Sequence, residues 1–458
     1  MNFKFNIDNI LTSSRILVLS FVLLIIIGSV LFSFSSVYSD SSRMSLIDRV
    51  FTATSATCVT GLTVIDVGTK FNFAGQVILL VLIQFGGLGL MTFSTLFILI
   101  LGRKILFREK LLLQEGLNRY DISNITSLLK YLVGFTFIME AIGAFVLYSR
   151  FGNLSHRTFN AIFHSISAFC NAGFSLFSNS LINYYKDPVV IITISFLIVF
   201  GGLGFFVNYE IRNFLLNKIN RIQKFFKIKL KFVPNNLSLH SKIVLTTTII
   251  LIIVGMILLF IFEYNGILKN KNIGESVSIT YFQSVTARTA GFNTVNIYSL
   301  SNSSLLILIL LMFIGGSPGS TAGGIKTTTF ATLYFVITSI LKGNKNVVAF
   351  YRTINDTIVR RALSIFMLSI TAVFIGFLLI LTIEGRNFSF IEILFEVVSA
   401  FGTVGLSTGI TPFLSSFSKG VIIILMLIGR VGPLTLAVSI LEKGGNDIRY
   451  PEESLSVG

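Results

Sequence analysis

Four short phrases centred on glycine recur along the chain at nearly equal intervals. Glycine adopts positive φ without steric strain, so a loop built around it can point successive backbone carbonyls toward one axis. A ring of such carbonyls can replace the hydration shell of a cation. The recurrence therefore predicts a cation filter with one phrase from each of four repeats. The phrases are Val59, Thr60, Gly61 and Leu62; Asn171, Ala172, Gly173 and Phe174; Thr289, Ala290, Gly291 and Phe292; and Thr403, Val404, Gly405 and Leu406.

A second glycine-containing run lies downstream of each phrase, within an apolar segment. Such glycines can kink a helix or allow close packing, and packing is the default interpretation. The third run is longer and polar and contains a proline, so it cannot continue a regular helix. We expect it to split its span into two halves joined by a loop just inside the filter. This intramembrane loop contains Gly315, Gly316, Ser317, Pro318, Gly319, Ser320, Thr321, Ala322, Gly323, Gly324 and Lys326.

The corresponding run of the fourth repeat contains Arg430 in an otherwise apolar segment. A charged side chain at that depth is functional by default, because its transfer into a bilayer is unfavourable. We expect Arg430 to face the pore or to pair with the loop of the third repeat.

The composition places these motifs in a membrane. Of the 458 residues, 53% are hydrophobic and 12% are charged, and the mean hydropathy is +0.84. This is more apolar surface than one soluble core could bury. A membrane-spanning helix needs about 20 apolar residues, and eight segments approach or exceed that length. The expected spans are 16–34, 73–101, 125–148, 188–216, 242–262, 303–340, 361–383 and 419–441.

A shorter segment precedes each glycine phrase, at 46–58, 159–170, 277–288 and 390–402. These segments are too short to cross and fit re-entrant half-helices, whose C-terminal dipole ends favour a cation. The predicted fold is an all-α membrane protein with four helix–pore loop–helix repeats, that is, eight transmembrane helices and four pore half-helices in pseudo-four-fold arrangement around one pore. The expected repeats are residues 1–102, 103–218, 219–342 and 343–458.

The net charge of +16 is distributed unevenly. Lys and Arg concentrate in the three linkers between repeats, with two more at each terminus, whereas the filter sides carry fewer. The positive-inside rule then places both termini and the three linkers in the cytoplasm. The charge indicates topology, with contact to anionic lipid, rather than nucleic-acid binding. The N-terminal apolar run exceeds a signal-peptide core, which favours a retained span over a cleaved signal.

The remaining polar residues form no catalytic pattern and no transition-metal site. Cys58 and Cys170 lack metal-ligand spacing and are expected to pack behind the filter. His164 and Glu396 each lie nine residues before a filter glycine, where a structural hydrogen bond is expected. Glu140 lies within a span, with a polar group of a pore helix or water as its partner. We therefore expect that this protein is not an enzyme.

The main alternative is an alternating-access transporter for a small organic solute. Broken helices and glycines near the membrane midplane occur in such proteins. They usually contain two repeats, whereas this chain shows four. The symmetry favours a pore.

Together these motifs resemble the Trk/Ktr/HKT superfamily of potassium transporters, most closely the membrane subunits of bacterial Ktr systems. The resemblance covers essentially the whole chain. It rests on the four filter glycines, the phrase at 286–293, the loop at 315–329 and the run at 429–435.

The resemblance implies that the four phrases select K⁺, that the intramembrane loop is a gate, and that Arg430 narrows the pore beneath the filter. It implies a homodimer on a cytoplasmic ring of RCK-type nucleotide-binding regulatory subunits, with no organic cofactor in this chain. Na⁺ dependence is common in Ktr systems, although no residue here establishes it. Glycine at all four filter positions favours K⁺. Gating is expected to be concentrated in the third and fourth repeats.

Overall fold

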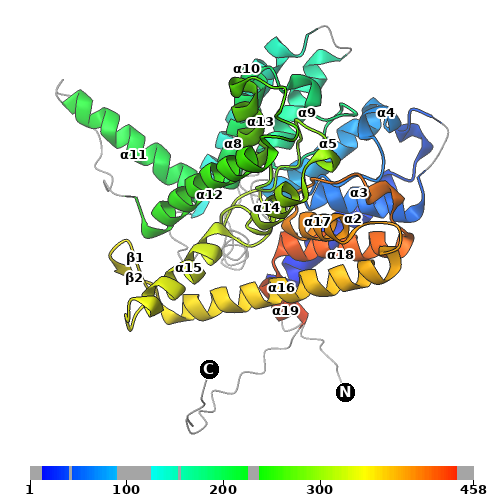
Figure 1. The fold of residues 1–458 in the computed structure, drawn as a ribbon. Helices are drawn as coiled ribbons and strands as arrows, with labels where there is room; N and C mark the ends of the chain where they lie inside the picture. The colour runs from blue at the N-terminus through cyan, green and yellow to red at the C-terminus, as the bar shows by residue number, and fades with distance from the viewer. Residues whose placement is uncertain (1–12, 41–43, 90–124, 153–155, 225–236, 441–458) are drawn as a thin grey trace, which may run out of the picture.

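The computed structural model describes residues 13–40, 44–89, 125–152, 156–224 and 237–440. These residues are almost entirely helical (Figure 1). Within the described ranges, one small hairpin pairs β1 (Val348–Ala349) with β2 (Arg352–Thr353) in antiparallel register. The prediction of a helical protein is confirmed in this part of the chain.

One long apolar helix begins each predicted repeat. These four helices are long and apolar enough to cross a membrane. Large apolar side chains are exposed along them, as expected of surfaces in contact with lipid. The helices are α2 (Ser13–Leu31), α8 (Ile125–Arg150), α12 (Leu239–Glu263) and α16 (Asp356–Glu384).

A short helix of 12 to 14 residues packs against each long one and leads into a glycine phrase. Local signals start two of them: the Ser45 hydroxyl accepts a hydrogen bond from the backbone N–H of Asp48, and Ser389 forms a capping box with Glu392. The C-terminal halves are buried, which places these ends inside the protein. The helices are α3 (Leu46–Thr57), α9 (Arg157–Phe169), α13 (Ile273–Thr286) and α17 (Phe390–Gly402).

The second helix of the second and fourth predicted repeats is sharply bent, which is the kink that the sequence left open beside the default interpretation of close packing. α10 (Pro188–Gly202) meets α11 (Phe205–Lys224) at 106°, and α18 (Ser416–Val431) meets α19 (Pro433–Ile440) at 99°. Glycines at both bends have positive φ, 91° at Gly204 and 95° at Gly432. These glycines therefore end helices rather than only providing close packing.

The other two repeats differ again. α5 (Phe73–Leu88) ends before Gly89, and the rest of the expected span 73–101 lies outside the described residues. α14 (Asn302–Phe313) and α15 (Thr327–Leu341) are separated by the predicted loop. Counting each bent pair as one, the described residues contain six candidate membrane spans, and α5, α14 and α15 are shorter apolar helices.

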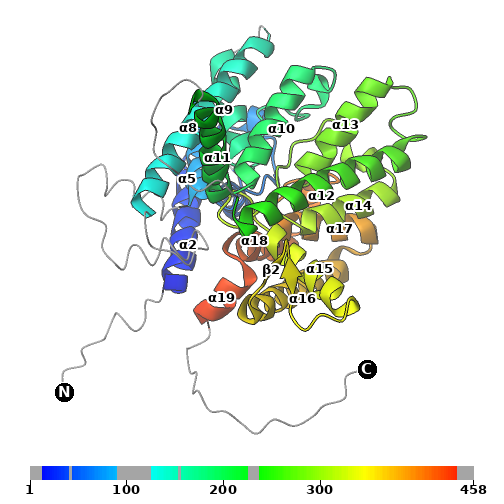
Figure 2. The same cartoon turned by 90° about the vertical axis from the view of Figure 1, so that its left-hand side faces the viewer.

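A short helical segment follows each glycine phrase: α4 (Val67–Lys70), η2 (Ile182–Tyr184), η3 (Ile297–Ser299) and η4 (Thr411–Phe413). Another turn, η1 (Ser35–Val37), follows α2. Figure 2 shows α15, α19 and the hairpin together at one end of the molecule. Apolar clusters between neighbouring repeats hold the structure together, for example Phe51 with Val397 and Phe169 with Phe282.

Candidate ion filter and gate

The four glycine phrases meet in a closed ring. A Cβ atom placed on any filter glycine would lie within 3.0 Å of a backbone oxygen of the next phrase. That oxygen always belongs to the residue before the next glycine, and the fourth phrase returns to the first. Any side chain at these positions would push a neighbouring carbonyl out of place. The pairs are Gly61 with Ala172, Gly173 with Ala290, Gly291 with Val404, and Gly405 with Thr60.

Each phrase contains two residues with positive φ. The glycines have φ between 69° and 94°, as the predicted alternation of backbone conformation requires. The residue two positions earlier also has positive φ, between 50° and 73°, although three of the four are β-branched. This conformation is unfavourable for such residues, so the surrounding structure must hold it in place. The residues are Val59, Asn171, Thr289 and Thr403.

Hydroxyl groups near the ends of the short helices hold the phrases. The hydroxyls of Ser167, Thr286 and Ser399 donate to the carbonyls of Phe174, Phe292 and Leu406, at 2.6 to 2.8 Å. In the first phrase the Ser55 hydroxyl accepts from the backbone N–H of Gly61 at 3.1 Å. These residues were not among those predicted from the sequence. Their signal is a Ser or Thr five or six positions before each glycine.

Two buried residues behind the ring make the structural hydrogen bonds that were expected of them. His164 contacts the Ser175 hydroxyl at 2.9 Å, and Glu396 accepts from the Ser407 hydroxyl and from that of Thr411. Both therefore brace the residue two positions after a filter glycine. Glu140 accepts from the Gln84 side-chain amide at 3.0 Å, on α5 of the preceding repeat, and from the Cys170 thiol at the end of α9 at 3.9 Å.

The predicted loop of the third repeat is closed at its neck by its own backbone. The N–H of Gly315 donates to the Ile325 carbonyl at 2.9 Å, and that of Thr327 donates to Gly316 at 3.0 Å. The hydroxyls of Ser317 and Thr327 lie 3.0 Å apart across the neck. The two halves of the broken span are thus held side by side.

The body of this loop packs beside the ring, between the second and fourth repeats. The N–H groups of Ser317 and Thr321 donate to the carbonyls at the end of α10, and that of Phe205, which begins α11, donates to Gly319 at 2.9 Å. A Cβ on Gly323 would meet the side chain of Thr403 in the fourth phrase. The loop therefore contacts both the filter and the bent helix of the second repeat.

Arg430 contacts this loop, which is one of the two positions expected from the sequence; the other was facing the pore. Its guanidinium donates to the carbonyl of Thr321 and to those of Gly86 and Gly87 on α5, the last at 3.1 Å. One cation thereby connects three predicted repeats below the ring. Lys326 adds a second positive group, whose ammonium donates to the Ala322 carbonyl at 2.7 Å.

A second buried arginine, Arg288, lies behind the ring, and the sequence analysis did not assign it a role. It is three residues before Gly291, where the other repeats have Cys58, Cys170 and Gly402. Its guanidinium donates to the carbonyl of Gly315 at 3.1 Å and to that of Thr248 at 3.4 Å. Arg288 therefore joins the third filter phrase to the neck of the loop.

The downstream glycines pack against the short helices, as the default interpretation expected. A Cβ on Gly86, Gly201 or Gly429 would collide with a carbonyl at the end of α3, α9 or α17. Gly87 lies against the sulfur of Cys170, so this thiol packs behind the filter.

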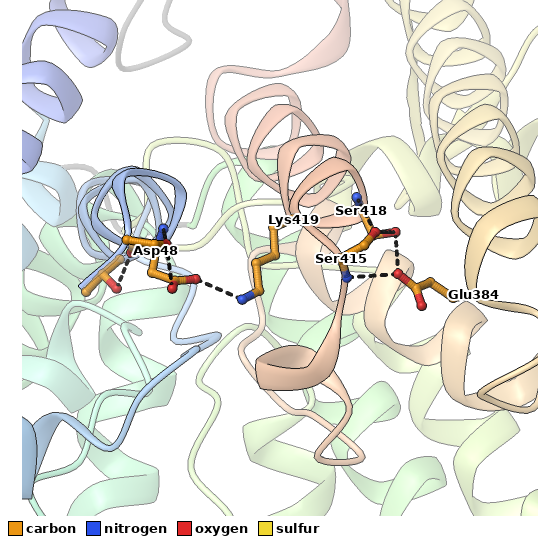
Figure 3. A network of polar contacts seen from close by, with 7 residues as sticks. Asp48, Glu384, Ser415, Ser418 and Lys419 are labelled. Carbon is orange, nitrogen blue, oxygen red and sulfur yellow. Dashed lines mark hydrogen bonds and ion pairs between the residues drawn. The ribbon is translucent and has the colours of Figure 1, made fainter. Parts of the chain in front are cut away.

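A polar network joins the first and fourth repeats near the N-terminal ends of α3 and α18 (Figure 3). Lys419 of α18 forms an ion pair with Asp48 of α3 at 2.8 Å. One turn away, Glu384 accepts from the N–H of Ser415 and the hydroxyl of Ser418, both at 2.9 Å. α18 is therefore anchored to α3 on one side and to α16 on the other.

Comparisons with known proteins show the family. The model of the TrkH family, described as a cation transport protein, matches residues 6–446. Ktr system potassium uptake protein B from Bacillus subtilis is 41% identical over 452 residues, covering 98% of this chain and 97% of its own. Potassium/sodium uptake protein NtpJ from Enterococcus hirae is 38% identical and covers 98% of each chain.

The fold is also similar to the crystal structure of the potassium transporter TrkH from Vibrio parahaemolyticus. The TM-score is 0.72 at 18% identity, and the match covers 96% of this chain and 87% of the other. The relatives are transporters rather than enzymes, as expected. The chain therefore belongs to the TrkH family of cation transport proteins.

Proposed function

We propose that this chain is the potassium-translocating subunit of a gated uptake system in the cell membrane. The observation that carries the proposal is the closed ring of four glycine phrases. Relatives named as Ktr potassium uptake proteins support K⁺ as the ion, and the potassium/sodium uptake relative makes Na⁺ the competitor to test. The membrane potential can drive entry, since one charge gains about 2.3 kcal/mol per 100 mV.

In this proposal, backbone carbonyls of the ring replace the water around K⁺. The best placed are those of Thr60, Ala172, Ala290 and Val404, because each one lies against a glycine of the adjacent phrase. The C-terminal ends of four short helices add a negative potential that favours cations. The hydroxyls behind the ring keep its diameter constant. One glycine per phrase supplies few carbonyl layers, so we expect weaker selection than in filters with longer carbonyl runs.

The loop from Gly315 to Lys326 is the proposed gate. It lies below the ring, and two positive side chains, Arg430 and Lys326, accompany it. Positive charge in a narrow, poorly hydrated path opposes a cation. Opening then requires the loop to leave its contacts with α10 and Arg430. Deletion within 317–326 should raise flux.

The wider architecture is part of the same proposal. The four repeats, at 1–102, 103–218, 219–342 and 343–458, surround one pore with eight spans and four half-helices. Both termini face the cytoplasm. The Ktr names describe systems, which supports a separate partner. We propose a homodimer that binds an RCK-type nucleotide-binding regulatory subunit.

The test is electrical and uses the purified full chain in liposomes. Reversal potentials are measured under opposed K⁺ and Na⁺ gradients for the unaltered protein and for Gly291→Ser. For the unaltered protein we expect a reversal potential near the equilibrium potential of K⁺. For Gly291→Ser we expect a shift toward the equilibrium potential of Na⁺, because a side chain at this position displaces the Val404 carbonyl.

The matched control is Gly409→Ser. Gly409 also has positive φ, 99°, but a Cβ there meets no atom within 4 Å. Equal reversal potentials for Gly291→Ser and the unaltered protein would contradict the filter assignment. Uptake of an organic solute without ionic current would instead support the alternating-access alternative.

A further inference from the structure

A cavity of about 550 Å³ lies between α8, α10 and α11, away from the ring and the gate. It is created by the 106° bend that follows α10, which directs α11 away from the other helices (Figure 1). The volume is in the range of sites that hold small organic ligands.

Apolar side chains from three helices line this cavity. Phe135 and Ile138 of α8, Phe200 of α10, and Leu215 of α11 line it. These residues form a trough open to the surface that the predicted topology places in lipid. Such a trough accommodates a hydrocarbon chain.

Two positively charged side chains line the cavity. Lys130 of α8 and Arg212 of α11 both line it, and the Arg212 guanidinium lies 5.3 Å from the centre of the Tyr131 ring. No acidic residue is among its described lining. The neighbouring Glu210 is engaged with the hydroxyls of Ser238 and Ser241. Two cations thus face a site without a compensating anion.

An unsatisfied acceptor lies deeper in the same cavity. Asn208 is 3% exposed, and its amide donates to the Phe200 carbonyl at 2.8 Å. Its side-chain oxygen is buried and has no partner in the described structure. Leaving a buried acceptor unpaired is unfavourable, so the site suits a ligand that brings a hydroxyl donor.

We propose that this cavity binds an anionic glycerophospholipid of the cytoplasmic leaflet, with its phosphate on Lys130 and Arg212 and a headgroup hydroxyl on Asn208. An acyl chain lies along the trough. Phosphatidylglycerol has this combination of phosphate, hydroxyl and chain. Basic pockets between helices on the cytoplasmic side are suited to such headgroups.

The position of the cavity gives bound lipid a route to the gate. The bend that forms it carries the hydrogen bond from Phe205 to Gly319, and the end of α10 accepts from the loop. A lipid wedged between α8 and α11 holds this bend in place.

The experiment titrates delipidated full-length protein with phosphatidylglycerol or phosphatidylcholine and counts bound lipid by native mass spectrometry. We expect tighter binding of phosphatidylglycerol. Lys130→Gln with Arg212→Gln should weaken it about thirtyfold, because two basic contacts are lost. The control pair, Lys345→Gln with Arg360→Gln, removes the same charge from exposed positions elsewhere and should leave binding unchanged.

A third variant fills the cavity and leaves its two positive charges in place. Gly134 lines the cavity, and a Cβ there meets nothing within 4 Å, so Gly134→Phe fills the trough without a clash at Cβ. It should weaken phosphatidylglycerol binding without lowering the melting temperature. Equal binding of both lipids, or unchanged binding in this variant, would overturn the proposal. Saturation by inorganic phosphate alone would overturn it as well, by assigning the site to the free anion.

Discussion

The ring of glycine phrases is built in nearly the same way in all four predicted repeats, whereas the helices beneath it differ. In the ring, each glycine has positive φ and contacts the next phrase. Below it, α10 and α18 end in bends of 106° and 99°, while α14 is followed by the loop. The described part of α5 ends before Gly89.

The difference has a geometric reason. A closed ring needs every phrase to fit two neighbours, so one altered phrase disturbs the others. The helix breaks below contact different partners, so each can change by itself. In the proposed function, ion selection is therefore shared among four repeats, and gating is assigned to one loop and its contacts.

The largest effect is expected from an alanine at any filter glycine. Gly61→Ala, Gly173→Ala, Gly291→Ala and Gly405→Ala should each lower the K⁺-to-Na⁺ preference tenfold or more, about 1.4 kcal/mol in relative binding. Gly409→Ala is the control with positive φ and open space. The K⁺-to-Na⁺ preference is measured as the ratio of K⁺ flux to Na⁺ flux through each purified variant. A strong effect at one glycine with none at the other three would contradict a shared ring.

A smaller effect is expected from Arg430→Ala, and it concerns the K⁺ flux rather than the ion preference. Removing the guanidinium releases the Thr321 carbonyl and one positive charge beneath the ring. K⁺ flux should rise severalfold, with the K⁺-to-Na⁺ preference retained. Arg430→Lys keeps the charge and should stay near the original flux. An Arg430→Ala protein with normal expression and unaltered flux would show that this residue does not restrict the path.

Arg288→Gln tests the connection between the two regions. The substitution removes the guanidinium that donates to the Gly315 and Thr248 carbonyls. The free energy of unfolding should fall by about 1 to 3 kcal/mol. We also expect a modest rise in flux, because the neck of the loop loses a support. Arg288→Lys is the conservative variant and should restore part of both. Lower stability with flux unchanged would limit Arg288 to a structural role.

The smallest effect is expected at the ion pair between Asp48 and Lys419. The pair is mostly shielded, with side-chain exposures of 22% and 11%, and pairs near a surface contribute about 0.2 to 1 kcal/mol. A double-mutant cycle with Asp48→Asn and Lys419→Met measures its coupling through thermal unfolding in detergent. The pair of Arg150 with Asp187, within one repeat, serves for comparison. A large loss of ion preference in these variants would mean that the outer ends of the helices also shape the ring.

Much of the site could be predicted from the chain alone. The spacing of the glycine phrases identified the ring residues, and the proline and glycines after Ile314 predicted the break in the third repeat. The isolated charge of Arg430 predicted a contact with the loop of the third repeat. These are local signals, because backbone conformation and hydropathy are properties of short segments.

Other features needed the tertiary structure. The order of contacts around the ring, the role of Arg288 and the unpaired oxygen of Asn208 each depend on segments far apart in sequence. In the sequence, the glycines at the two bends, Gly204 and Gly432, cannot be told apart from glycines that only allow close packing. Their positive φ angles in the structure identify them as the residues at which the helices bend. The sequence determined which residues could form a carbonyl ring and where a helix must break. The tertiary structure decided which carbonyl meets which glycine and which cation holds the loop, because those choices follow from how the four repeats close on one another.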